Sequence, residues 1–231
     1  MAVTEAEAKV IPFRPRRPAA ADPGDLRFRT LVGEEGWTQL PAAVRARFGR
    51  HVGEGRSIVY SGEVIECRMS RCGRLLAQLL RPIGAPLPLS RDLFVPATVS
   101  VTEDPASGGQ FWMRIYGRRS AFPQVIHSIK RFSGPTGLEE YIGCGIGIAL
   151  RVAVEHGALH FLSDHYFLEI GRLRLRLPRL LEPGRMKVSH VDCGDGGFAF
   201  ALSLDHPLLG CLVHQTAMFR ERFAAGEGAE Q

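Results

Sequence analysis

Short runs of alternating apolar and polar residues, separated by glycine-containing turns, most constrain what this chain can fold into. The dipeptide His156-Gly157 joins the runs 145–155 and 159–163, and a turn at 194–197 joins two further runs. Short linkers with glycine between such runs are typical of β-hairpins. No helical segment between the runs is long enough for the crossover that parallel strands require. We therefore predict a mainly β fold: an antiparallel meander forming a barrel or a strongly bent sheet.

Short helices are expected before and within this sheet. Leu40, Val44 and Phe48 fall on one face of a helix, which Pro41 can begin and Gly49 can end. A second helical candidate covers residues 74–80, where four leucines stand between a glycine and a proline. The fold class is therefore mainly β with short N-terminal helices.

Length and composition are consistent with one domain. The chain has 231 residues, and all-β barrels of this size are often single units. Residues before Asp25 combine proline, alanine and charge without a period, which is typical of disorder. We predict a disordered tail over 1–25, a single β-rich domain over 26–223 and a disordered tail over 224–231.

Charge and cysteine usage exclude several classes of protein. The net charge is only +5, and Arg172, Arg174 and Arg176 alternate with leucines as on the wet face of a strand, so no nucleic-acid binding is expected. Five cysteines without a CxxC pair argue against a disulfide framework or a zinc site, and for a reducing compartment. Without a secretory signal or a long apolar stretch, we predict a cytoplasmic protein with no stable membrane insertion.

The strand over residues 111–118 carries the most informative candidate site. Period-two alternation places Trp112, Arg114 and Tyr116 on one face and Phe111 with Met113 on the other. We interpret the Phe111 face as core. The other face is aromatic and cationic, and an arginine between aromatic rings can bind a carboxylate or another anion. The alternative is a solvent-exposed face with cation–π pairs.

Two further residues are candidates for the same site. Glu140 shares a strand face with Leu138 and Ile142, so we expect it to be drawn inward with Arg114 as its partner. The pair could be structural, or Glu140 could be an acid–base group with a raised pKa. His127 falls inside a strand and could also point inward, although a single histidine is more often structural.

Other familiar signatures are absent or point to structure. The run from Gly143 to Gly147 lacks the third glycine and the following helix of a dinucleotide site, and sheet curvature is the favoured explanation. The histidines at 156, 160 and 165 have no ligand spacing, so no metal is predicted. Nucleophile-elbow, HExxH and P-loop patterns do not occur, and no cofactor is expected.

Several short motifs, taken in order, resemble those of an uncharacterised bacterial family of domains of unknown function. They are Trp112-x-Arg114-x-Tyr116, Glu140, Leu177-Pro178 and Pro207-Leu208-Leu209-Gly210, followed by Gln215. The resemblance covers roughly residues 28–219. Members of that family occur alone or fused to membrane or oxidoreductase-like domains. This chain has Gln215 and Ala217 where the family tends to have an aromatic residue and a glycine. The resemblance implies no activity, but it singles out Trp112, Arg114 and Glu140.

Three hypotheses about function follow. The leading one is a domain that binds a small hydrophobic molecule, lipid-like or polyketide-like, whose anionic or carbonyl group meets Arg114 between Trp112 and Tyr116. The second is a cofactor-free isomerase or hydrolase in the same cavity, with Glu140 or His127 as general base. The third is a protein-interaction domain, which a large exposed apolar patch would favour. The sequence leaves the oligomeric state and the choice between enzyme and binding domain open.

Overall fold

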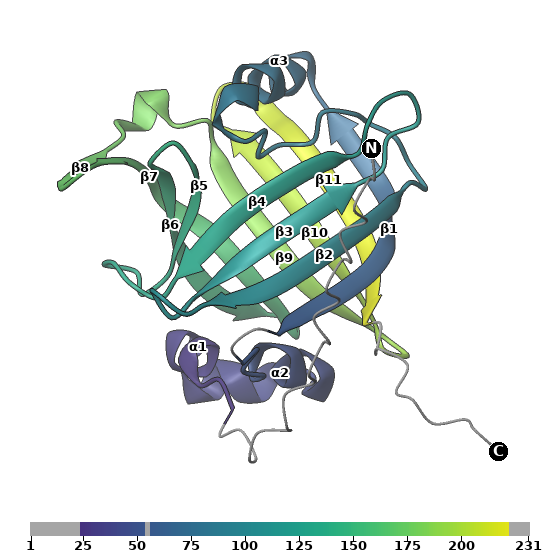
Figure 1. The fold of residues 1–231 in the computed structure, drawn as a ribbon, viewed down its shortest axis with the longest axis vertical. Coiled ribbons are helices and arrows are strands. Elements are labelled where there is room, and N and C mark those ends of the chain that lie inside the picture. Colours follow the sequence, from purple (N-terminus) through teal and green to yellow (C-terminus); the bar gives the residue numbers. More distant parts are fainter. Residues whose placement is uncertain (1–23, 54–55, 222–231) are drawn as a thin grey trace, which may run out of the picture.

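The computed structural model describes residues 24–53 and 56–221, so the predicted tail over 224–231 and most of the tail over 1–25 lie outside the described residues. Ten strands close into an antiparallel barrel, and an additional short strand, β8, extends from it (Figure 1). The strands are β1 (Ser57–Met69), β2 (Pro96–Asp104), β3 (Gly109–Tyr116), β4 (Gln124–Arg131), β5 (Glu139–Gly143), β6 (Ile146–Glu155), β7 (Ala158–Ile170), β8 (Leu173–Arg176), β9 (Arg185–Gly194), β10 (Gly197–His206) and β11 (Gly210–Glu221). The predicted fold class is confirmed.

Two long-range pairings close the barrel. Strands β1 to β6 follow one another as neighbours, and β9, β10 and β11 do the same. The first strand, β1, pairs with the last strand, β11, and β7 pairs with both β6 and β9. Among the described strands, β8 pairs with the outer end of β7 alone. The meander therefore forms a continuous wall in which every pairing is antiparallel.

The two tight turns of the sequence are hairpins, as predicted. His156 and Gly157 have φ of 51° and 74°, and Asp195 and Gly196 have φ of 49° and 72°. Two successive residues with positive φ are the signature of the turn whose twist matches antiparallel strands. Strand β7 differs from the prediction, because it runs without a break where two strands were expected. A bulge opposite Ala149 and Leu150 allows its pairing with β6 to continue.

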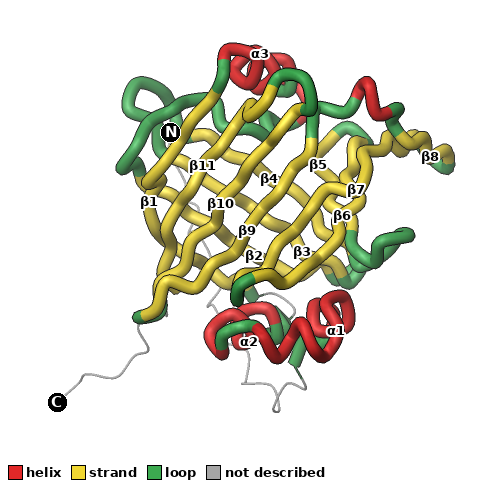
Figure 2. The backbone as a smooth tube through the Cα atoms, turned by 180° about the vertical axis from the view of Figure 1, so that it is seen from behind, coloured by secondary structure: helices red, strands yellow, loops and turns green. Residues whose placement is uncertain are grey.

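Two N-terminal helices, α1 (Arg27–Gln39) and α2 (Ala42–Phe48), cover one end of the barrel (Figures 1 and 2). Trp37, Leu40, Val44 and Phe48 are buried there and join the core of the barrel. Asp25, which was assigned to the tail, is instead buried, and its carboxylate accepts a hydrogen bond from the backbone N–H of Arg27 at 2.9 Å. The folded part therefore begins before the predicted boundary.

The third helix, α3 (Arg71–Leu79), lies at the opposite end of the barrel, followed by the 3-10 turn η1 (Arg81–Ile83). It begins three residues before the predicted helix because the hydroxyl of Ser70 accepts a hydrogen bond from the N–H of Gly73. A second 3-10 turn, η2 (Arg179–Leu181), precedes β9 at the same end. No helix of the described residues is long and apolar enough to cross a membrane.

The alternation predicted for the strand around Trp112 is present, but the prediction that its Phe111 face is core is wrong. Phe111 and Met113, which were interpreted as core, are 44% and 42% exposed on the outside of β3. Trp112 is buried inside the barrel. This difference results from closure of the barrel. The inner face of every strand must fill one shared interior, and in β3 the Trp112 face points into it.

Candidate functional site

The interior of the barrel contains a cavity of about 120 Å³ in the half nearer α3. Its wall is mostly apolar and includes Val99, Ile126, Ile148, Phe161, Met186 and Leu202. Leu80 and the segment 86–88 contribute from the α3 side, and Pro183 contributes from the loop before β9. We call this space the barrel cavity and its α3 side the mouth. The α1–α2 end is filled by core side chains instead.

An aromatic pair separates the barrel cavity from the α1–α2 end. The rings of Trp112 and Phe200 pack edge to face with their centroids 6.0 Å apart, and both rings line the barrel cavity. Both also line a smaller space of about 30 Å³ toward α2. The indole N–H of Trp112 donates to Gln110 at 3.2 Å, which satisfies the buried donor and fixes the ring. Trp112 therefore acts as part of the cavity floor.

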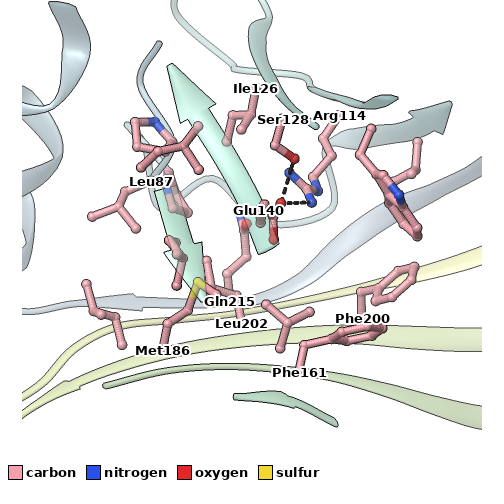
Figure 3. A pocket seen from close by; sticks show the side chains of 18 of the residues that line it. Leu87, Arg114, Ile126, Ser128, Glu140, Phe161, Met186, Phe200, Leu202 and Gln215 are labelled. Atoms are coloured by element: carbon pink, nitrogen blue, oxygen red, sulfur yellow. Dashed lines mark hydrogen bonds and ion pairs between the residues drawn. The ribbon is translucent and has the colours of Figure 1, made fainter. Parts of the chain in front are cut away.

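A charged cluster stands on the otherwise apolar wall (Figure 3). One oxygen of Glu140 accepts from the hydroxyl of Ser128 at 2.5 Å and from the guanidinium of Arg114 at 3.0 Å. The other oxygen accepts from the ammonium of Lys130 at 2.7 Å. The predicted pair of Arg114 and Glu140 is therefore present. We call these four residues, Arg114, Ser128, Lys130 and Glu140, the polar cluster.

Sequence reasoning missed Lys130 and Ser128. Both share the inward face of β4 with Ile126, and Lys130 stands directly opposite Glu140 across the β4–β5 pair. Its ammonium also lies 5.0 Å from the Trp112 ring and 5.5 Å from the Phe161 ring. Period-two alternation along residues 124–130, phased by the apolar Ile126, was the signal that could have found them.

The polar cluster has two cations and one carboxylate, all largely removed from water. The side chains of Lys130 and Glu140 are 5% and 7% exposed, and that of Arg114 is 22% exposed. Burial alone would raise the pKa of Glu140, but Lys130 and Arg114 outweigh it and hold that pKa far below its ordinary value. Burial lowers the pKa of Lys130; Glu140 opposes this, and Arg114 adds to the lowering. Glu140 is therefore an ionised partner of cations, in contrast to the raised pKa considered from the sequence.

Tyr116 and Gln215 also line the barrel cavity. Burial raises the pKa of Tyr116, so its phenol stays neutral and can donate a hydrogen bond. Gln215 is buried on β11, and its side-chain amide makes no hydrogen bond to any residue that the structure describes. Its side chain approaches the polar cluster from the opposite wall (Figure 3). The cavity thus offers a free amide and a phenol in addition to its cations.

His127 does not join the site. It lies on the outward, exposed face of β4, between the inward-facing Ile126 and Ser128. The strand alternation that brings Ser128 into the barrel cavity turns His127 away from it. Of the predicted site residues, Trp112, Arg114, Tyr116 and Glu140 come together in the structure, and His127 does not.

The histidines and glycines considered from the sequence have structural surroundings. His160 hydrogen-bonds to the hydroxyl of Ser189 at 2.8 Å, and no cluster of metal-ligating side chains occurs among residues 24–53 and 56–221. Gly143 and Gly145 form the β5–β6 turn with positive φ. A Cβ on Gly147 would lie 2.2 Å from the ring of Phe167, so this glycine is required for ring packing.

A family model matches most of the chain. The model of a family described as a domain of unknown function (DUF4166) matches residues 40–219. No curated protein matches the chain, and no solved structure does. The matched region contains all eleven strands except the last residues of β11, and it includes the whole polar cluster.

Proposed function

The chain belongs to the DUF4166 family of domains of unknown function, and from that premise we propose that its barrel binds a small hydrophobic molecule carrying one anionic group. The anionic group would lie against the polar cluster, and the apolar part would fill the barrel cavity. The bacterial origin and the domain fusions implied by the resemblance, and the cytoplasmic location, stay predictions.

The observation that carries the proposal is the imbalance of charge in the polar cluster. Arg114 and Lys130 share the single carboxylate of Glu140 inside an apolar wall. A buried cation is costly unless it is paired, and the lowered pKa of Lys130 reflects this incomplete compensation. An anionic head group beside Arg114 would supply the second negative charge. The guanidinium is suited to this role because it can bind a carboxylate through two parallel hydrogen bonds.

The cavity dimensions limit the apolar part of the ligand. An apolar cavity of roughly 150 Å³ accepts a benzene molecule, and the barrel cavity has about 120 Å³. A small ring or a short alkyl chain would therefore fit inside. A longer chain, as in a fatty-acid-like or polyketide-like acid, would extend through the mouth between Pro86 and Pro183, both of which line it.

The enzymatic alternative loses its proposed general bases. Glu140 already accepts hydrogen bonds from Ser128, Arg114 and Lys130, and its pKa is lowered, so it is a weak proton acceptor. His127 is on the outer wall. The geometry therefore supports binding better than acid–base catalysis.

The proposal is tested by comparing two ligands that differ only in the head group. Isothermal titration calorimetry with octanoate and octanol should show tighter binding of the acid. Arg114→Gln should weaken octanoate binding at least about tenfold, because a hydrogen bond to a charged group contributes about 1.5–3 kcal/mol. It should leave octanol binding nearly unchanged.

A matched control removes a cation elsewhere. Arg56→Gln changes an exposed arginine on the side of α2, away from the mouth, and should bind both ligands as the unmodified protein does. Native mass spectrometry of gently purified protein adds a search for a co-purifying acid. Equal affinity for acid and alcohol, or equal losses of octanoate binding in Arg114→Gln and Arg56→Gln, would contradict the proposal.

A further inference from the structure

Large apolar side chains surround the mouth of the barrel and point into solvent. We call the following exposed residues the mouth surface: Leu75, Leu79, Phe122, Leu180, Leu208 and Leu209. They come from α3, the β3–β4 loop, η2 and the β10–β11 turn, which all lie at the α3 end (Figures 1 and 2). Phe122, Leu180 and Leu208 are 93%, 87% and 84% exposed. Among the described hydrophobic residues more than half exposed, Leu26 is the one at the α1–α2 end.

The orientation of α3 accounts for part of this surface. The residues that α3 buries against the barrel are small, Gly73 and Ala77. A Cβ on Gly73 would lie 2.0 Å from the carbonyl oxygen of Leu212, so the helix rests directly on the β11 backbone. Leu75 and Leu79, four residues apart, then face outward. Exposed apolar residues that gather at one end of a molecule indicate an interaction site.

Arginines outnumber acidic residues at this end of the barrel. Three segments at the α3 end, 67–91, 117–123 and 170–181, together contain eleven arginines and no aspartate or glutamate. Arg71 and Arg74 are exposed on the same helix as Leu75 and Leu79. Acidic residues such as Asp92 and Glu182 occur just outside these segments. Exposed leucines interleaved with arginines are typical of helices that lie in the interface of an anionic membrane.

We propose that the mouth surface docks on a bilayer containing anionic phospholipids, with the leucines and Phe122 in the interface and the arginines against the head groups. In this orientation the mouth of the barrel cavity faces the lipid. An apolar ligand could then pass between bilayer and cavity without crossing water. The docking surface is separate from the polar cluster, so this inference goes beyond the proposed function and can fail independently of it.

Vesicle flotation of the full chain tests the docking. Vesicles of phosphatidylcholine with phosphatidylserine should carry the protein, whereas phosphatidylcholine alone should carry much less. Added salt should release it, because screening shortens the range of the arginine attraction. Leu75→Gln with Leu79→Gln should lower the bound fraction through the apolar contacts. Arg71→Gln with Arg74→Gln should lower the affinity about tenfold or more, since each surface arginine contributes roughly one kcal/mol near anionic lipid.

Two paired variants outside the mouth surface serve as controls. Phe111→Gln with Met113→Gln changes exposed apolar residues on the outer wall of β3, and Arg56→Gln with Arg220→Gln changes exposed arginines toward the α1–α2 end. Both should bind anionic vesicles as the unmodified chain does. Absence of binding to anionic vesicles, as expected if a protein covers this surface, overturns the proposal. Equal losses in the control and mouth variants overturn it too. Octanoate binding in solution does not depend on vesicles, so its failure would be seen separately.

Discussion

Glu140 is the residue on which the polar cluster depends, because it is the shared acceptor of two buried cations. Glu140→Leu would leave Arg114 and Lys130 without a counter-charge. Breaking a buried ion pair in this way typically costs about 3–5 kcal/mol. We therefore expect the free energy of unfolding, measured by urea denaturation, to fall by about that amount.

A second variant separates lost charge balance from lost packing. Glu140→Leu combined with Lys130→Met removes the closest cation together with the carboxylate, and both replacements suit an apolar wall. The double variant should be more stable than Glu140→Leu alone. If instead the two changes destabilise additively, the charges are not coupled as the geometry indicates.

His190 gives a stability difference that depends on pH. It is fully buried among the rings of Phe48, Phe198 and Phe200, and its Nδ1 has no partner among the described residues. Burial, reinforced by the nearby Arg47, lowers the pKa of His190 to about 3. The folded state thus resists the proton that the unfolded chain takes up near its ordinary pKa. The contribution of neutral His190 to stability is fully present above about pH 6.5. This contribution is lost as the pH falls toward about 3.

The corresponding variant is His190→Leu. Between about pH 7 and about pH 5 the unmodified chain should lose about 2 kcal/mol through His190, because each pKa unit corresponds to about 1.36 kcal/mol. His190→Leu should lose correspondingly less in urea denaturation over that range. His127→Asn, at an exposed histidine, is the control and should keep the slope of the unmodified chain. A slope that His190→Leu leaves unchanged would show that other groups cause it.

Strand β1 is the element whose packing depends most directly on one glycine. A Cβ on Gly62 would lie 1.7 Å from the carbonyl oxygen of Met218 in the paired strand β11. That atom belongs to backbone and cannot move without disturbing the pairing that joins the first and last strands. We expect Gly62→Ala to cost roughly 2–3 kcal/mol in urea denaturation, as for other overpacked sites.

Gly36 offers the matched substitution in a helix. A Cβ there would meet Val32 and Val154 at 3.4 and 3.6 Å, which is ordinary contact. Since alanine favours a helix by up to about 1 kcal/mol over glycine, Gly36→Ala should be neutral or stabilising. If both variants lost a similar amount of free energy of unfolding, the loss in Gly62→Ala would not result from a clash with β11.

The positions of the strands and helices were largely predictable from the sequence. Which face of a strand points into the barrel was not. Alternation along β3 correctly separated Trp112 and Arg114 from Phe111 and Met113, because period two is a local property of the strand. Which face turns inward depends on the other strands. Both faces of β3 carry large apolar residues, so local hydrophobicity did not decide between them. Alternation along β4, phased by Ile126, could have placed Lys130 on the inward face, but its position opposite Glu140 follows from the register of β4 and β5.

For the whole molecule, the sequence predicted an antiparallel barrel or bent sheet but not how it is closed. The hairpins follow from local turn residues such as Asp195 and Gly196. The pairing of β1 with β11 joins opposite ends of the chain, and the α1–α2 cover depends on packing between distant segments. The barrel cavity results from these long-range arrangements. Its position could not be derived from local patterns, although most of its charged residues could be named.

Because the barrel is closed, binding of a ligand in the barrel cavity can be measured as an increase in the stability of the whole molecule. The walls of the barrel cavity come from strands along the whole chain, so a ligand in it should stabilise the folded molecule as a unit. At a free octanoate concentration of about 100 times its Kd, the free energy of unfolding should rise by about 2.7 kcal/mol. For a chain of this size that corresponds to a Tm increase of roughly 5–10 °C. At the same concentration, the weaker binding of Arg114→Gln should leave at most about half of that increase, about 1.4 kcal/mol, and Arg56→Gln should show the full increase. An unchanged or lowered Tm of the unmodified chain in differential scanning calorimetry would contradict binding of octanoate to the folded barrel.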